Sequence, residues 1–352
     1  MKKKLTIAII IGFVSLIAGL ILAGIGFFTG GITRLEEVAA PTEVHKTFTD
    51  LNTIKIDFIP HSVYIKESSD NNYHVTYANS DNNIQTPLKL SEKDGVLTLS
   101  AQELEFAIEG IMQYLGESLA QRRINVFSVT IEVPKGKTLN KLEGDHFYKS
   151  ASFVIENVHI KEANLSGGVD LNKVTIDSGQ IETGYFQATQ STLKDMHINL
   201  HESSVRLSET SLENVTIKNY QELNANQLTL LGKNVLTPSE YSLSVTNINL
   251  TDKSLQDINL NISTQLDIKT LAEHLGYHYE TLEELKQAVG DMSYFNEQAE
   301  NVGIFTKDKY QTLSIKKEED KQTLTLEKKE SNNSLTVTST NATINLRTPT
   351  PK

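Results

Sequence analysis

Short segments in which apolar and polar residues alternate recur along the chain from residue 53 onward. An alternation with a period of two is typical of half-buried β-strands, because successive side chains of a strand point to opposite faces of the sheet. Turn-forming residues at 68–72, 79–83 and 93–95 separate several of these segments. We therefore predict strands at 53–58 (TIKIDF), 62–66 (SVYIK), 73–77 (YHVTY), 95–100 (GVLTLS) and 126–133 (VFSVTIEV).

One phrase repeats between residues 153 and 230: an apolar residue, two or three polar residues, and then V/M-x-I/L. The markers Val158, Val174, Met196 and Val215 lie 16, 22 and 19 residues apart. A period near twenty, with Gly, Asn, Asp and Ser in the breaks, favours a β-solenoid, in which each coil buries its apolar face against the next. A β-sandwich built of comparable strands is the alternative.

Asparagines lie in or beside the expected bends of these repeats. Asparagine tolerates left-handed backbone and bonds to its own main chain, so it suits such corners. The residues concerned are Asn164, Asn172, Asn199, Asn214 and Asn224.

The C-terminal part returns to simple alternation. Segments 311–316, 322–327, 334–339 and 342–346 each alternate apolar and polar residues, and 318–321 and 331–333 have turn composition. We expect these segments to form closing hairpins.

Two stretches depart from the β pattern. The first, 103–121, has apolar residues at helical spacing and is followed by Arg122 and Arg123, which suit a helix C-terminus. We expect a helix that covers an open end of the solenoid; a membrane-surface helix is the alternative, but its polar face carries glutamates where such a helix carries lysines. The apolar stripe consists of Leu104, Ile108, Ile111, Leu115 and Leu119.

The second departure contains two capping boxes, Thr270 with Glu273 and Thr281 with Glu284. In a capping box the hydroxyl and the carboxylate satisfy free amides at a helix N-terminus. Gly276 and Gly290 are plausible helix stops. The sequence therefore predicts two short helical insertions in the β domain, at about 103–123 and 270–299.

An uncharged apolar run covers residues 5–28. At about 1.5 Å per residue, a helix of this length crosses a hydrocarbon layer of roughly 30 Å, so we predict a transmembrane helix and a lipid bilayer as partner of residues 5–28. The lysines at 2–4 precede the run and only Arg34 follows it closely, which places the N-terminus in the cytoplasm and the C-terminal domain outside the cell. A cleaved signal peptide is the alternative, with Ala39 and Ala40 as small residues at the cleavage position.

The spacing of Gly26 and Gly30 within this segment is of the small-xxx-small type. That spacing permits close approach of two helices and hence a homodimer through the transmembrane helix. Glycine is also generally common in membrane helices, so the spacing alone has a plainer explanation.

Composition narrows the function classes. The chain has no Cys and no Trp, and carries 33 basic against 44 acidic side chains, a net charge of −11. Absence of Cys excludes disulfide frameworks, thiolate metal sites and thiol catalysis. The acidic balance argues against nucleic acid as a partner, because phosphate neutralisation needs basic residues. Since the first 34 residues hold four of the cations and no acid, the rest carries 29 basic against 44 acidic residues, which attracts cationic peptides and repels polyanions.

No motif points to a cofactor, and we expect no catalytic, cofactor-binding or metal-ligating residues. His274 and His278 have a spacing that binds zinc on an unbroken helix, but Gly276 interrupts it and HLGYH lacks the internal glutamate of the metalloprotease motif. His197 and His201 share this spacing on an expected strand, where four residues span roughly 13 Å. A solenoid can carry paired acids for glycan cleavage, so a glycan-processing enzyme is the alternative function.

The order of these elements resembles a known family. The membrane helix, the TIKIDF, SVYIK and GVLTLS strands, VTIEVP followed by KGKTLNKLEG, and the repeated LSGGVDL and SLENVTI phrases are similar to the bacterial putative-adhesin family, a β-strand repeat domain of unknown function numbered 4097. The resemblance covers roughly residues 48–346. It implies an extracytoplasmic, envelope-associated β-solenoid without general enzymatic activity, and a link to envelope stress in some relatives.

We thus expect a mainly β protein with a cytoplasmic tail (1–4), a transmembrane helix (5–28), a linker (29–47), an extracytoplasmic β-repeat domain (48–346) and a short tail (347–352). The expected function is non-catalytic binding or sensing at the bacterial cell envelope. An envelope protein, a polymer or a cationic peptide is the expected partner.

Overall fold

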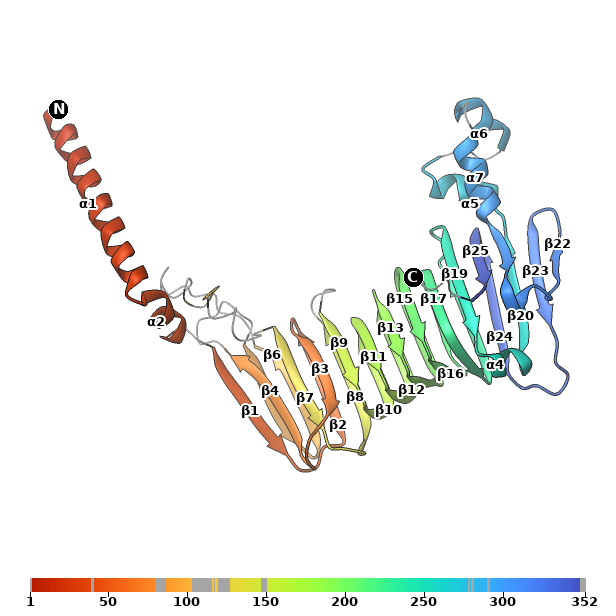
Figure 1. Cartoon of the computed structure of the whole chain (residues 1–352), viewed down its shortest axis with the longest axis horizontal. Helices are drawn as coiled ribbons and strands as arrows, with labels where there is room; N and C mark the ends of the chain where they lie inside the picture. The colour runs from red at the N-terminus through yellow and green to blue at the C-terminus, as the bar shows by residue number, and fades with distance from the viewer. Residues whose placement is uncertain are drawn as a thin grey trace. The chain divides into compact units, whose positions relative to one another are not determined.

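The computed structural model (Figure 1) shows a mainly β chain with an N-terminal helix and a few short helices. Two compact units are distinguished, one comprising 1–45, 76–89 and 101–128, the other 46–75, 90–100 and 129–352. We describe each unit by itself. The structure describes residues 2–38, 41–79, 87–102, 116, 118–119, 127–146, 151–277, 279, 282–289 and 292–348.

The first unit contains helix α1 (Lys2–Phe28) and helix α2 (Gly31–Val38). Residues 9–28 of α1 are long and apolar enough to cross a membrane, and none of this span is buried in the protein, although a signal sequence passes the same test. The predicted helix over the apolar run is confirmed. Helix α2 falls in the stretch expected to be a linker. The helix expected at 103–121 lies outside the described residues, apart from 116 and 118–119, which are helical.

The second unit is a stack of coils, each of which contributes to two rows of mainly parallel strands. Gly144 of one row lies against the ring of Phe153 of the other, so the buried side chains of the two rows face each other. The first row contains β6 (Val96–Ala101), β2 (Thr53–Ile59), β8 (Thr138–His146), β10 (His159–Ser166), β12 (Thr175–Thr183), β14 (Thr192–Lys194) with the start of β15 (Met196–Ser208), β16 (Ser211–Glu213) with the start of β17 (Thr216–Leu231), β18 (Lys233–Pro238), β24 (Ser334–Thr340) and β20 (Asn259–Gln265).

The second row runs beside the first in the same coil order (Figure 1). It contains β7 (Ser128–Val133), β3 (Ser62–Glu67), β9 (Ser152–Glu156), β11 (Gly168–Asn172), β13 (Phe186–Thr189), the later parts of β15 and β17, β19 (Ser244–Leu250), β25 (Ala342–Leu346) and β21 (Gly303–Thr306). The remaining strands are β1 (Thr42–Phe48), β4 (Tyr73–Asn79), β5 (Leu88–Lys93), β22 (Ile315–Lys317) and β23 (Lys321–Leu326). This parallel coil stacking confirms the solenoid and excludes the antiparallel β-sandwich.

In-register apolar stacks hold the coils together. One stack pairs each residue with its equivalent in the next coil and is almost fully buried: Ile160, Ile176, Leu193, Leu212 and Leu230. Burying each such side chain contributes roughly 1.5–3 kcal/mol before entropy is subtracted. The coil period is therefore set by these stacks.

The predicted repeat markers are partly wrong. Val158 and Val174 occupy equivalent positions, since the Thr175 amide donates to the Val158 carbonyl at 3.1 Å and Thr192 donates likewise to Val174 at 2.8 Å. Met196, however, pairs with Gly179 in a different stack. Val174 and Met196, which lie 22 residues apart, therefore belong to two different stacks. The sequence did not separate these stacks, because both carry apolar residues in similar phrases.

At one corner, successive coils each turn at a residue with left-handed backbone. These residues follow one another at one corner and are exposed: Asn157, Lys173, Gln190, Glu209 and Gln227, with φ from 49° to 56°. A second corner has Asp195 and Asn214, so the bend predicted at Asn214 is confirmed.

Asn172 directly precedes the corner residue Lys173, so its expected place beside a bend is confirmed. The other three asparagines lie within strands, and the expectation is wrong for them. Asn164, Asn199 and Asn224 donate side-chain hydrogen bonds to Glu162, Glu182 and Glu222 at 2.6–2.8 Å. Asn172 ends β11 without a positive φ. Strand pairing with neighbouring coils therefore outweighs the preference of asparagine for turns.

The C-terminal hairpin prediction holds for one pair of strands only. β22 and β23 are antiparallel, as expected. β24 and β25, in contrast, pair in parallel with β18 and β19 and form a further coil, while the region between β20 and β21 departs from the stack. Apolar and polar residues alternate in the same way in a hairpin strand and in a strand of a coil, so the sequence did not distinguish the two.

Short helices occupy the second predicted insertion: α5 (Ile268–His274), α6 (Leu282–Val289) and α7 (Ser293–Asn301). The N-cap of α5 is Asp267, whose carboxylate accepts from the Thr270 amide at 2.8 Å, so the expected cap at Thr270 is wrong. Gly276, with φ of +84°, ends α5 as predicted. Thr281 and Gly290 lie outside the described residues. Helix α4 (Asp252–Gln256) and the turn η1 (Asp308–Tyr310) were not predicted.

Candidate functional site

The histidines that sequence spacing singled out do not form a metal centre among the described residues. His197 and His201 are both exposed on β15, and His274 lies in the last turn of α5 with its Nδ1 buried. His278 lies outside the described residues. Within the described part of the chain, no three His, Asp or Glu side chains gather closely enough to hold a metal ion.

Carboxylates of the described residues are all at least partly exposed, since the buried polar side chains there are Ser, Thr, Asn and His. A glycosidase needs two carboxyl groups about 5 to 10 Å apart with different environments. Among the described carboxylates, partial burial and then the neighbouring Glu156 raise the pKa of Asp170, which stays partly exposed.

A shallow hollow of about 350 Å³ lies beside the turn between β7 and β8. His159 is held there by Asp177, with Nε2 and Oδ2 at 2.8 Å, and by the hydroxyl of Thr138 at 3.1 Å. Lys137 pairs with Asp50 at 2.9 Å. Because these groups satisfy one another, the hollow is best explained as part of the coil corner.

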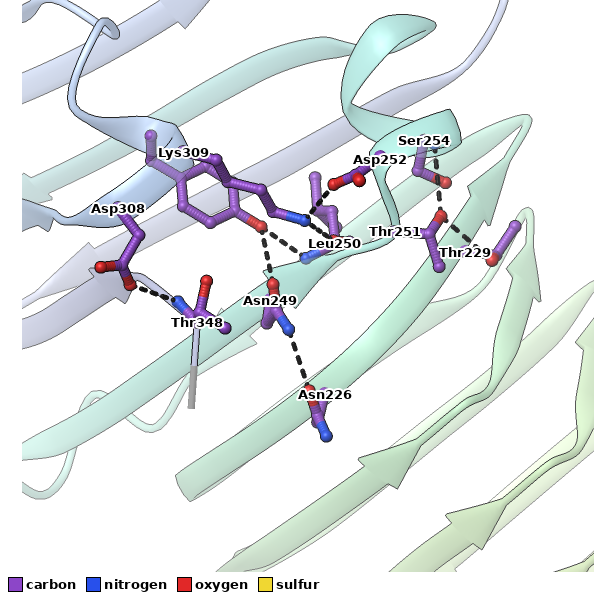
Figure 2. Close-up of polar contacts among 11 residues, drawn as sticks. Asn226, Thr229, Asn249, Leu250, Thr251, Asp252, Ser254, Asp308, Lys309 and Thr348 are labelled. Atoms are coloured by element: carbon purple, nitrogen blue, oxygen red, sulfur yellow. Dashed lines mark hydrogen bonds and ion pairs between the residues drawn. The ribbon is translucent and has the colours of Figure 1, made fainter. Parts of the chain in front are cut away.

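A polar cluster joins η1 to the last strands of the stack (Figure 2). The buried Tyr310 hydroxyl accepts from the Leu250 amide at 2.6 Å and donates to Asn249 Oδ1 at 3.3 Å. Asn249 donates in turn to Asn226 Oδ1 at 2.9 Å. Burial raises the pKa of Tyr310 to about 12, so its phenol stays protonated and serves as a structural donor.

Lys309 completes this cluster. Its ammonium donates to the Leu250 carbonyl at 2.6 Å and pairs with Asp252 at 2.7 Å, as Figure 2 shows. The cluster therefore anchors η1 to β19 and α4. Its groups are occupied by one another, which assigns it to the fold and not to ligand binding.

The outer face of the second row presents a different kind of surface. Strand register places equivalent residues of five neighbouring strands in one line: Gln187, Arg206, Asn224, Asn247 and Asn345. With Arg347, which donates to Asn247 Oδ1 at 3.2 Å, we call these residues the amide face. They point outward, because their strand neighbours Val205, Leu207 and Ile248 are buried.

Hydrogen bonds run along the amide face from coil to coil. Asn247 donates to Asn224 at 2.8 Å, and Asn345 donates to Asn247 at 2.9 Å. Each amide has two N–H donors and one carbonyl acceptor, so the ladder uses only part of their capacity. Neighbouring parallel strands lie about 4.8 Å apart, so the side chains of the amide face repeat at that spacing.

The amide face itself carries two positive charges, those of Arg206 and Arg347. Arg206 is exposed and has no hydrogen-bond or ion-pair partner among the described residues, and Arg347 is exposed as well. Two carboxylates lie beside this face: Glu222, which accepts from Asn224 at 2.6 Å, and Asp170, which is in register with Gln187 on the neighbouring strand. This surface therefore combines two guanidinium groups and a row of amides with two flanking carboxylates.

Sequence reasoning missed the amide face. It noted Asn224 only as a turn residue and did not consider Arg206. A usable signal was present in the repeated N-x-N phrases at 224–226 and 247–249, which place two asparagines on the same side of neighbouring strands.

The stacked parallel coils place the chain in the class of β-solenoid proteins. The profile of the Toastrack DUF4097 family matches residues 51–347, and the chain therefore belongs to this family, which confirms the resemblance predicted from its repeated phrases.

Two solved structures are similar to the chain. One is a putative cell adhesion protein from Clostridium sporogenes, 12% identical, covering 88% of this chain and 100% of its own, with a TM-score of 0.22. The other is a putative adhesin from Bacteroides fragilis, 13% identical, covering 60% of this chain and 89% of its own, with a TM-score of 0.29. No curated protein matches the chain.

Proposed function

We propose that the protein is a membrane-anchored, extracytoplasmic binding protein of the bacterial cell envelope that acts without catalysis. The observation that carries the proposal is the apolar helix at 9–28, none of which is buried in the protein. An uncovered apolar helix of this length is stable in lipid and not in water. The lysines at 2–4 favour an N-terminus in the cytoplasm and the β domain outside.

The solenoid supports a binding role. Its stacked coils display long rows of side chains at fixed spacing, which suits recognition of extended partners. The carboxyl groups of the described residues are all at least partly exposed, which favours binding over the glycan-processing alternative.

Membrane fractionation tests the anchor. We expect the full chain to remain in the membrane pellet after an alkaline carbonate wash, with an intact mass that includes residues 1–40. Deletion of residues 5–28 should release it into the soluble fraction. A mature protein that begins after Ala40 and is found in the medium would contradict the anchor and support the signal peptide.

A further inference from the structure

The amide face is a row of hydrogen-bonding groups on the described surface that includes a guanidinium without a side-chain partner. Arg206 is exposed and has no partner within the described part of the chain, and Arg347 shares an amide oxygen with the asparagine ladder. In the first row, some charged side chains pair with one another, such as Lys141 with Glu143 and Glu162. The amide face therefore offers a ligand a guanidinium donor that is not already satisfied, beside a row of amides.

We propose that the amide face binds a linear polysaccharide that carries carboxylates, such as a chain containing uronic acid residues. This inference rests on the proposed function, in which the solenoid is an extracytoplasmic binding surface.

Charge complementarity supports an anionic ligand. A guanidinium forms paired, charge-assisted hydrogen bonds with a carboxylate, a geometry that lysine does not offer. Arg206 and Asn247, the residue that Arg347 contacts, lie two strands apart, which corresponds to about 10 Å along the row. Two carboxylates on one short oligomer can reach both arginines.

The asparagines supply what the hydroxyl groups of a sugar require. Asn224, Asn247 and Asn345 each retain hydrogen-bonding capacity beyond the ladder, and they repeat along the direction in which a linear polymer would lie. Phe305, in register with Asn345, and Val245 border the row and are 39% and 37% exposed. They provide apolar area for the C–H faces of sugar rings.

A flat, hydrogen-bonding row matches an extended glycan better than a folded protein. A protein partner would require a larger apolar centre than these two side chains offer.

The test uses the full chain in nanodiscs of phosphatidylcholine and oligomers of galacturonic acid as the probe. Calorimetry or interferometry should detect binding that weakens as NaCl concentration rises. The same oligomers with their carboxylates methyl-esterified should bind at least ~10-fold more weakly, because loss of one charged hydrogen-bonded pair costs about a factor of ten.

Variants separate the amide face from overall charge. Arg206→Gln and Arg347→Gln should each weaken binding by ~10-fold or more, and Glu222→Gln should strengthen it, because a repulsive carboxylate is removed. Lys218→Gln is the matched control, since it removes one positive charge from an exposed residue of the first row. Its binding should equal that of the wild type.

Three results would overturn the proposal: no binding of the acidic oligomer, equal binding of the methyl ester, or equal weakening by Lys218→Gln and Arg206→Gln. If the full chain still stays in the membrane pellet after the carbonate wash, any of these results would reject the ligand but not the membrane anchor. Loss of the anchor with retained oligomer binding would instead reject the proposed placement alone.

Discussion

The phenolic oxygen of Tyr310 lies 2.6 Å from the backbone nitrogen of Leu250, and this hydrogen bond ties η1 to the end of β19. Tyr310 is fully buried, and its aromatic ring also lies 5.6 Å from the Lys309 ammonium. The tyrosine therefore fixes η1 against β19 with one apolar ring and one hydroxyl.

Replacing Tyr310 by Phe should lower the free energy of unfolding by about 1–3 kcal/mol, because the Leu250 amide then stays buried without its acceptor. Urea denaturation monitored by circular dichroism measures this difference. Tyr241→Phe is the control, since Tyr241 is 78% exposed and should change stability by less than about 0.5 kcal/mol. Equal effects of the two substitutions would show that the buried hydroxyl does not contribute.

Gly179 occupies a position that no other residue can take without rearrangement. Its φ is +146°, and an added Cβ would approach the Ala163 carbonyl oxygen of the preceding coil to 1.9 Å. Gly179→Ala should destabilise the solenoid by roughly 3 kcal/mol or more. Gly184→Ala, where no atom lies within 4 Å of the added Cβ, should be nearly neutral, as judged by thermal unfolding. A stable Gly179→Ala protein would disprove the close contact between these coils.

Acid should destabilise the N-terminal coils through His146. Its ring stacks on Phe153 with centroids 4.1 Å apart, and its Nε2 is buried with no partner among the described residues. Burial lowers the pKa of His146 below its ordinary value of 6.5. The unfolded state thus binds this proton more tightly, so stability is complete above about pH 6.5 and decreases as pH falls toward the lowered pKa.

Comparison of the wild type with His146→Leu isolates this contribution. The loss of unfolding free energy between about pH 7.5 and about pH 5 should be smaller in His146→Leu. His197→Leu, at an exposed position, should keep the pH dependence of the wild type. If both variants kept the pH dependence of the wild type, the buried imidazole of His146 would not be the cause of the loss of stability in acid.

Local pattern predicted the strands well and their partners poorly. The alternation at 53–58 and 62–66 follows directly from one buried and one exposed side of each strand, so β2 and β3 were found. The corners at Lys173 and Glu209 could not be found this way, because neither residue type favours left-handed backbone and the coil geometry imposes it.

The amide face depends on long-range register. Arg206 and Asn224 are 18 residues apart, whereas Asn224 and Asn247 are 23 apart, because the coils differ in length. A fixed period therefore does not bring these residues together, and only the pairing of whole strands does. The unequal coil lengths also explain why Met196 was predicted to be equivalent to Val174.

Cysteine labelling in intact cells tests the central claim most directly, since the chain has no cysteine of its own. Single variants Lys218→Cys in the solenoid and Lys3→Cys before the apolar helix would be treated with a membrane-impermeant maleimide. We predict that Lys218→Cys is labelled in intact cells and that Lys3→Cys is labelled only after permeabilisation. Labelling of Lys3→Cys in intact cells together with protection of Lys218→Cys would contradict the account.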